Sequence, residues 1–547
     1  MLRRSNQKSK RGFFFMCFSL IVFFVSALIF STFSPDLVSA QDTVGEEINF
    51  IEGNTIKLPL KSVIFLALKN NLQIAFESLG PDVSETDIAR EESVYDPNVS
   101  LKFGKSRRVT QTGNFLAGAG ETSIYQQSWD LEVGVMKKFV SGTSAELKWD
   151  SSDSKTDFLF QALVPEYRSE LNLSLTQPLL KDFGIDVGKS MIKIASLNFK
   201  ISQDQFKNRV IDILHEINRL YWNLYFQMKD YEAREHSLKL AKDLLREFKI
   251  KIEAGTLAPI EIYQAEAEVA TRKEDLIIAL DLLRDTEDTL KTALSFYEKE
   301  QYWDLAIIPV DEPRSTAVKE DLMESLKVAF QYRPDYNQAK MDIEARKIMV
   351  KYTKNQVLPR VDLFGTIGTM GLGGRGNPDA IDFAGGGNGE AARSFSTHWD
   401  DVADHMASGD FYNYTIGLKI EFPLGNRFAK SQYSRAKVEA LRAATYLKDL
   451  ENNVINDVRM AIRQVATDFE RIQAAKASLR LSVEKLKAEE KKYAVGLSTA
   501  HDLLEFQQDL ARAKSREAKS LADYEKDLTS LARAKGVLLE EYNITID

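Results

Sequence analysis

Two carboxylates near the C-terminal end are spaced so that they could act together. Asp502 and Glu505 are three residues apart, so a helix would place them on one face, one turn from each other. Paired carboxylates can serve as general acid and base, but no partner histidine or nucleophile cluster is evident. They follow a predicted turn, where the dipole of a new helix favours carboxylates. We therefore expect a structural or electrostatic role for the pair, and no enzyme.

The other residues that could do chemistry are too scattered for a metal or redox centre. The one cysteine, Cys17, excludes an intramolecular disulfide, a four-cysteine zinc site and CxxC chemistry. His398 and His405 enclose three aspartates, but an incidental surface position in a loop is the better interpretation. We expect no metal and no cofactor.

A glycine-rich segment, residues 365–389, contains ten glycines. It lacks the Gly-Lys-Ser/Thr ending of a phosphate-binding loop, and no parallel βαβ pattern surrounds it. The segment is predicted to be a long flexible loop between two strands. Over the whole chain, 72 basic residues face 80 acidic ones, and the net charge of −8 gives no reason to expect nucleic acid.

The first 40 residues have the pattern of a signal peptide. A basic start is followed by an apolar run from Phe13 to about Phe33 and by small residues up to Ala40, where cleavage is expected. An uncleaved membrane anchor is the alternative. No later stretch has about 18 uninterrupted apolar residues, so no further transmembrane helix is predicted. An exported chain of this kind is either soluble or enters a membrane as β-strands.

Three long segments are predicted to be helical because they lack both proline and glycine: 189–254, 426–495 and 497–535. A helix of 65–70 residues would be roughly 100 Å long. The last two segments carry sustained heptads, which favour coiled-coil packing in a helical wall or bundle. Each long helix turns back at a hairpin tip that contains a glycine. The tip residues are Gly255 and Thr256 in the first hairpin and Gly496 and Leu497 in the second.

Other segments alternate apolar and polar residues with period two, which predicts strands with one apolar face. A soluble sandwich and a membrane barrel fit this alternation equally well. The chain is predicted to have six strands. Four lie at about 98–108, 127–138, 143–152 and 167–177, and two follow later, one of them within 411–422.

These features occur twice along the chain. A short helix, a proline that opens a strand, a proline at a strand exit and a glycine tip recur in the same order. The strand boundaries are Pro97, Pro178, Pro359 and Pro423. We predict an N-terminal segment (41–57), a first repeat (58–300), a linker (301–320), a second repeat (321–541) and a C-terminal end (542–547).

In the order, spacing and duplication of these motifs, the chain from about residue 58 to 541 resembles the TolC family of outer-membrane efflux and export channels. The resemblance implies a trimer in which a β-barrel in the outer membrane continues into a long α-helical barrel in the periplasm. It implies transport from periplasm to exterior, with a periplasmic adaptor and an inner-membrane pump as partners. The motifs are the four prolines, Gln177-Pro178-Leu179, Phe422-Pro423-Leu424, and Tyr493-x-x-Gly496 followed by Asp502-Leu503-Leu504.

The resemblance also implies a gate at the hairpin tips. Tyr493 would belong to the links that close the periplasmic entrance, with Glu261 as the facing partner, and Asp502 and Glu505 would form acidic rings. The position two residues after Gly496 is basic in the best-known member, but here it is Ser498, so a charged lock is not implied there.

Two functional classes stay open: an export duct, and a periplasmic coiled-coil adaptor or scaffold with a soluble sheet. For a duct, six strands in each of three copies would give eighteen. The cargo stays open among drugs, metals, proteins and polysaccharides.

Overall fold

The computed structural model describes residues 51–52, 55–111, 113, 122–255, 258–298, 300–380 and 397–546. The chain divides into two units, Met1–Gly53 and Asn54–Asp547. Only strand β1 (Ile51–Glu52) is described in the first unit. The predicted signal peptide, with Cys17 and the expected cleavage after Ala40, therefore lies outside the described residues. All the other described elements belong to the second unit.

The same order of elements occurs twice in this second unit, as the sequence predicts. The first pass runs through α2 (Leu60–Asn70), α3 (Leu72–Glu92), η1 (Ser93–Tyr95), β3 (Asn98–Gln111), β4 (Ser123–Lys138), β5 (Ser144–Thr156), β6 (Leu163–Pro178), α5 (Ile185–Gly188), α6 (Ser190–Glu253) and α7 (Ile260–Ala293). The second pass runs through α8 (Leu322–Tyr332), α9 (Pro334–Gln356), β8 (Arg360–Gly376), α11 (Trp399–Ser408), β9 (Tyr412–Glu421), α12 (Arg427–Ala494), α13 (Ala500–Lys535) and α14 (Leu538–Glu541).

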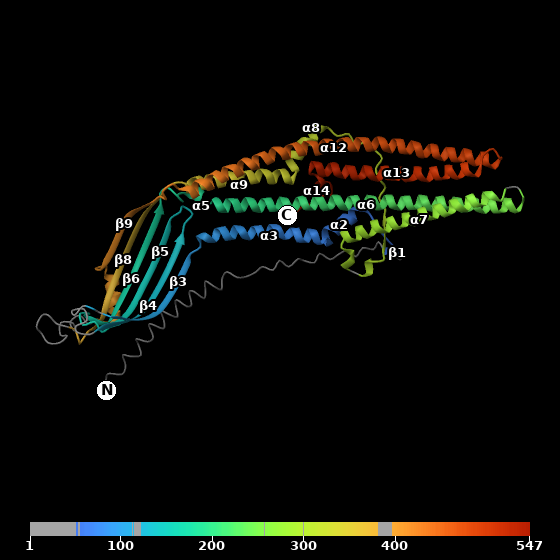
Figure 1. The fold of residues 1–547 in the computed structure, drawn as a ribbon. Helices are drawn as coiled ribbons and strands as arrows, with labels where there is room; N and C mark the ends of the chain where they lie inside the picture. The colour runs from blue at the N-terminus through green and yellow to red at the C-terminus, as the bar shows by residue number, and fades with distance from the viewer. Residues whose placement is uncertain are drawn as a thin grey trace. The chain divides into compact units, whose positions relative to one another are not determined.

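The strands form one antiparallel sheet in the order β3-β4-β5-β6-β8-β9 (Figure 1). The short turn Phe139–Thr143 returns the chain from β4 to β5, and the Phe139 N–H donates to the Thr143 carbonyl at 2.7 Å. The shortest of the first four predicted strands, 143–152, thus corresponds to β5, which pairs with both β4 and β6. The prediction of six strands is confirmed for the described residues.

The two faces of this sheet differ in chemistry because side chains alternate along each strand. On one face, Leu101, Val133, Trp149 and Leu171 lie side by side across four strands. The other face carries charged pairs. These are Lys102–Glu132 at 3.7 Å, Lys148–Glu132 at 3.3 Å and Arg168–Glu170 at 2.6 Å.

The long helices form two hairpins, α6–α7 and α12–α13, whose tips lie at the end opposite the sheet (Figure 1). Apolar residues at heptad spacing fill the seam between α12 and α13, where Val465, Ile472, Tyr524 and Leu531 form one buried cluster. Helix α9 packs against both α6 and α12. Among the described residues, none of the helices combines the length and apolarity needed to cross a bilayer.

The predicted linker contains an element that the sequence analysis did not anticipate. Strand β7 (Ala306–Pro309) pairs in parallel with β2 (Thr55–Leu58), and the short turns η2 (Phe296–Glu298) and η3 (Glu300–Tyr302) precede it. The Tyr221 hydroxyl of α6 lies 2.6 Å from the Asp311 carboxylate, which ties the linker to the long helix. Four-residue strands are too short for periodicity to reveal.

The loop prediction for the glycine-rich segment was wrong over residues 365–376, which belong to strand β8. Hydrogen bonds to β6 and β9 hold this stretch extended despite its glycines. His398 and His405 lie at the start and near the end of helix α11, not in a loop. Residues 381–396 of the predicted loop lie outside the described residues.

Candidate gate at the hairpin tips

The second tip is a helix end closed by glycine. Gly496 has a φ of 78°, and the Leu497 N–H donates to the Lys492 carbonyl at 2.9 Å. This left-handed glycine with a six-residue hydrogen bond is the Schellman ending of a helix. Leu497 is largely exposed beyond it. The tip prediction for both residues therefore matches the observed turn.

Asp502 caps the helix that begins after the turn. Its carboxylate accepts the Thr499 hydroxyl at 2.7 Å and the Thr499 N–H at 3.3 Å, and the Thr499 hydroxyl oxygen accepts the Asp502 N–H in return. These hydrogen bonds hold the pKa of Asp502 below its ordinary value. Glu505, one turn further, is exposed and makes no ion pair with the described residues. Of the two predicted ring carboxylates, only Glu505 is thus free of a capping role.

Ser498 stabilises the turn of its own hairpin, and it carries no charge that could form an ion pair across the predicted gate. Its hydroxyl donates to the carboxylate of Glu489 on α12, which also pairs with Lys492 at 3.1 Å. The Ser498 and Lys492 hydrogen bonds lower the pKa of Glu489. Glu489 is buried within the hairpin, and the sequence analysis missed it because a glutamate in a charged run reads as a solvated face.

Tyr493 joins the second hairpin to the first hairpin of the same chain. Its ring stacks on Phe248 of α6, with centroids 6.4 Å apart, and the Lys251 ammonium lies 4.7 Å from the ring centroid. Burial raises the pKa of the Tyr493 hydroxyl, and the charge of Glu261 adds to the shift. In the part of the chain that the structure describes, no hydrogen bond joins Tyr493 to Glu261.

The first tip is described only in part. Gly255, with a φ of 70°, ends α6, whereas Thr256 lies outside the described residues. Glu261 sits in the first turn of α7, where a carboxylate faces the positive end of the helix dipole. One further contact ties the two tips together, because the Gln264 amide lies 3.1 Å from the His501 ring.

Below the tips, the buried Arg272 of α7 connects three helices. Its guanidinium donates to Glu268 at 2.8 Å, to the Ser237 carbonyl of α6 at 3.0 Å and to the Leu504 carbonyl of α13 at 2.8 Å. The side chain is only 2% exposed. The sequence analysis missed this residue, although one signal was present. Arg272 lies seven residues from both Ala265 and Ala279, the buried alanines of the same helical seam.

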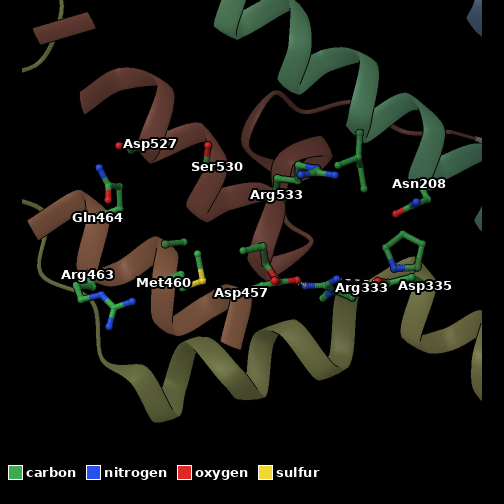
Figure 2. A pocket seen from close by; sticks show the side chains of 14 residues that line it. Asn208, Arg333, Asp335, Asp457, Met460, Arg463, Gln464, Asp527, Ser530 and Arg533 are labelled. Atoms are coloured by element: carbon green, nitrogen blue, oxygen red, sulfur yellow. Dashed lines mark hydrogen bonds and ion pairs between the residues drawn. The ribbon is translucent and has the colours of Figure 1, made fainter. Parts of the chain in front are cut away.

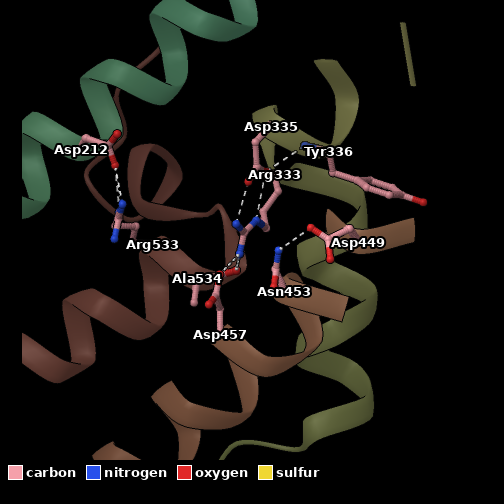
Figure 3. Close-up of polar contacts among 9 residues, drawn as sticks. All are labelled: Asp212, Arg333, Asp335, Tyr336, Asp449, Asn453, Asp457, Arg533 and Ala534. Atoms are coloured by element: carbon pink, nitrogen blue, oxygen red, sulfur yellow. Dashed lines mark hydrogen bonds and ion pairs between the residues drawn. The ribbon is translucent and has the colours of Figure 1, made fainter. Parts of the chain in front are cut away.

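A polar pocket of about 400 Å³ lies further along, where the start of α9 meets α6, α12 and α13 (Figure 2). Two of its three lining arginines form ion pairs. Arg333 contacts Asp335 at 2.7 Å and Asp457 at 3.2 Å, and Arg533 contacts Asp212 at 2.8 Å (Figure 3). Because Arg333 and Arg533 already have acidic partners, their ion pairs have a structural role: they fix α9 and the two hairpins against one another.

The four predicted boundary prolines lie at ends of strands. Pro97 and Pro359 immediately precede β3 and β8, Pro178 is the last residue of β6, and Pro423 lies two residues beyond the last residue of β9. Proline lacks the N–H that a sheet ladder requires, so these positions suit the change from sheet to helix.

Comparison with known proteins identifies this architecture. Residues 326–537 match the family described as outer membrane efflux protein. No curated protein sequence matches the chain significantly. Solved structures match over nearly the whole chain at low identity, and such likeness concerns the fold.

Three of these structures are outer-membrane proteins, and two of them are described as channels. The CmeC outer membrane channel of Campylobacter jejuni has a TM-score of 0.60 at 15% identity, over 89% of this chain and 90% of its own. The outer membrane protein VceC of Vibrio cholerae has a TM-score of 0.59 at 14% identity, over 87% and 96%. The open state of the MtrE outer membrane channel of Neisseria gonorrhoeae has a TM-score of 0.57 at 15% identity, over 88% and 89%.

An amphipathic antiparallel sheet joined to two long helical hairpins defines a class, the outer-membrane channels with a periplasmic helical part. Residues 326–537 match the outer membrane efflux protein family, and the solved structures share the fold of nearly the whole chain, so the TolC-like fold that the resemblance implies is confirmed. The structures that share this fold are outer-membrane proteins, which agrees with the function and the localisation that the resemblance implies.

Proposed function

We propose that three copies of this chain form the outer-membrane duct of a tripartite efflux or type I secretion system. The observation that carries the proposal is the single sheet with one apolar face, one charged face and two free edges, β3 and β9. An unpaired strand edge is not tolerated in lipid, because each unsatisfied N–H or C=O costs several kcal/mol. Three sheets joined edge to edge would close one barrel of eighteen strands.

Strand direction supports this closure. Strand β3 starts at the helical end of the sheet and β9 returns to it, so β9 of one copy would meet β3 of the next in antiparallel fashion. The charged pairs around Glu132 and Glu170 would then face the lumen, and the face with Leu101 and Leu171 would face lipid. We also propose that each copy consists of two repeats, residues 58–300 and 321–541.

The entrance would be gated at the tips. Three copies of Glu505, with Asp502 beside it, would place carboxylates around a narrow passage and attract multivalent cations. Tyr493, with Glu261 near its hydroxyl, would contribute the releasable link. A periplasmic adaptor and an inner-membrane pump would complete the pathway. The alternative, a scaffold with a soluble sheet, would need a layer that covers the apolar face, yet Leu101, Val135 and Leu171 on that face are 67%, 39% and 36% exposed.

The mass of the purified protein in detergent tests the duct proposal. Light scattering should give three times the chain mass, and the trimer should need detergent for extraction and resist mild SDS. A monomeric mass, or full solubility without detergent, would contradict the duct and favour the scaffold.

Conductance in planar bilayers tests the gate. Replacing both Asp502 and Glu505 by alanine should abolish block by multivalent cations, whereas Asp509→Ala, one turn further on the same helix, should leave it intact. If the double variant only loses about 1 kcal/mol of stability and stays blocked, the two acids merely cap their helix. Tyr493→Phe should raise basal conductance, and an unchanged conductance would locate the link elsewhere.

A further inference from the structure

Helix α11 lies on the apolar face of the sheet, above two glycines of β8. Val402 is only 1% exposed and packs over this strip. A Cβ added to Gly371 would lie 2.2 Å from the Val402 carbonyl oxygen, and one on Gly373 would lie 2.6 Å from a Val402 methyl carbon. Helix α11 can approach β8 this closely only because Gly371 and Gly373 have no side chains. These two glycines of the glycine-rich segment therefore have a structural role.

Hydrogen bonds fix the helix to the strand. The Thr369 hydroxyl donates to the Met406 carbonyl at 2.9 Å, and His405 Nδ1 lies 3.2 Å from the Leu372 carbonyl. His398 and Asp401 form a capping box at its start, and Gly409 ends it with a φ of 73°. The helix is thus attached to β8 by hydrogen bonds near its C-terminal end and by the packing of Val402 in its middle.

The helix sits where the chemistry of the apolar face changes. The row of paired residues Leu101, Val133, Trp149, Leu171 and Thr369 is largely apolar. Two residues further along the strands, away from the helical hairpins, the same face stays apolar at Phe103 and Leu131 but carries Ser151, Ser169 and Gly371 on β5, β6 and β8. Aromatic residues cluster at this border, as in Phe103 stacked on Trp129 at 5.5 Å. Aromatic belts of this kind mark the edge of a bilayer.

A cavity of about 360 Å³ lies between the helix and the sheet at this border. The Trp149 indole N–H already donates to the Ser169 hydroxyl at 2.7 Å, so the ring presents its apolar body to the cavity. The sheet side is lined by Trp149, Leu171 and Thr369, and the helix side by Trp399, Val402 and Met406. Trp399 is 40% exposed, so an apolar wall continues to the surface.

We propose that this cavity holds one hydrocarbon chain of a membrane lipid. The proposal rests on the proposed function, because the apolar face must lie in the outer membrane. The cavity opens on that face at its outer border, so a lipid there can insert a chain while its headgroup stays at the interface. Trp399 and Met406 bury the chain on one side and Trp149 and Leu171 on the other. Without helix α11 the outer face of the sheet would have no such cavity, so the helix creates the lipid site.

A photoreactive lipid tests the site in the intact protein. The protein is reconstituted in vesicles of phosphatidylethanolamine and phosphatidylglycerol containing a lipid with a diazirine in one acyl chain. It is illuminated either in the vesicles or after dilution into detergent, and adducts are mapped by mass spectrometry. In vesicles, both β9 and the cavity residues should be labelled. After dilution, labelling of β9 should fall at least fivefold while labelling of the cavity persists.

Variants on the same helix separate the cavity from the general surface. Met406→Trp and Ala403→Phe fill the cavity and should each lower its labelling at least fivefold. Asp404→Asn, on an exposed position of the helix, should leave it unchanged. Equal cavity labelling in the filled variants, or labelled β9 with an unlabelled cavity in vesicles, would overturn this inference alone. An unlabelled β9 in vesicles would overturn the proposed membrane function and this inference with it.

Discussion

The two longest helices come from equivalent places in the two repeats, yet their surroundings differ. Helix α6 has 64 residues and buries twenty of them, whereas α12 has 68 residues and buries ten. Helix α6 packs against α3, α7, α9 and α13, and Figure 1 shows it running among them. Helix α12 packs mainly against α8, α9 and α13, and it meets α6 near the tips, where Tyr493 stacks on Phe248.

The difference appears in the apolar residues that α12 leaves exposed. Phe428, Val438 and Leu441 are 79%, 65% and 68% exposed on that helix. A row of exposed apolar residues on a long helix indicates a surface that another chain covers. Duplication of the unit therefore did not duplicate its surroundings: α6 forms the core of one copy, whereas α12 leaves apolar residues exposed that would join copies in the proposed trimer.

Leucine truncation on the two helices should give the largest contrast. Leu214 of α6 is fully buried, so Leu214→Ala should lower the free energy of unfolding by about 3 kcal/mol. Leu441→Ala on α12 removes the same atoms from an exposed position and should cost less than about 0.5 kcal/mol within one copy. Denaturant unfolding of each variant measures both values. Equal losses of unfolding free energy in the two variants would show that α6 and α12 do not differ in burial.

The tie between the two hairpins should give the next largest effect. Arg272→Met removes the guanidinium that joins α6, α7 and α13, so the Glu268 carboxylate loses its ion pair and the Ser237 and Leu504 carbonyls each lose a side-chain donor. The free energy of unfolding should fall by about 2–3 kcal/mol. Arg512→Met serves as control, because Arg512 is largely exposed and its ion pair with Asp509 is long, at 3.9 Å. Similar losses of unfolding free energy in both variants would mean that Arg272 does not stabilise the contact between the two hairpins.

Within the second hairpin, Asp527 of α13 should make stability depend on pH. Burial and the adjacent Asp468 carboxyl raise the pKa of Asp527 from 3.8 to about 7, with Asp523 adding to the shift and Gln464 opposing it. Asp468 is fully buried and paired with Arg471 at 2.7 Å. A raised carboxyl pKa means that the folded state holds a proton that the unfolded state releases. The native chain therefore loses stability as pH rises from about 4 to 7.

Replacement by asparagine removes this dependence. Asp527→Asn should be more stable than the native chain by about 1–2 kcal/mol at pH 8, a value reduced for solvent screening of a half-buried group, and equal to it near pH 4. Thermal unfolding at several pH values measures the difference. A constant difference across that range would show that Asp527 is ionised in the folded protein.

The smallest expected effect concerns the joining surface. Besides its minor cost within one copy, Leu441→Ala should lower the temperature at which the trimer dissociates in mild SDS by a few degrees. The neighbouring exposed residue Arg442 supplies the control variant Arg442→Ala. Unheated gel electrophoresis over a temperature series measures both. If Leu441→Ala dissociates like the native protein, this part of α12 does not join copies.

Sequence periodicity predicted the repeated elements well because each had one dominant environment. Alternation identified five of the six strands, whereas β8 was anticipated only by the proline before it, because its glycines carry no alternation. The absence of proline and glycine identified the long helices. Residues whose roles depend on contacts distant in sequence were missed. Arg272 and Glu489 read as surface charges, and Gly371 and Gly373 read as loop, because only the tertiary structure places partners against them. At the tips, Gly496 was predictable from local turn chemistry, whereas the stacking of Tyr493 on Phe248 was not.

Disulfide cross-linking between copies tests the central claim most directly. In a Cys17→Ser background, one cysteine replaces Leu101 on β3, and a second replaces in turn Tyr412, Tyr414, Ile416, Leu418 or Ile420, which occupy the same face of β9. If three copies close one barrel through β3 and β9, oxidation in the membrane should give a covalent trimer for one or two neighbouring positions. A cysteine at Lys419, on the opposite face, should give none. Monomers alone at all five positions would contradict the closure of the duct by these edges.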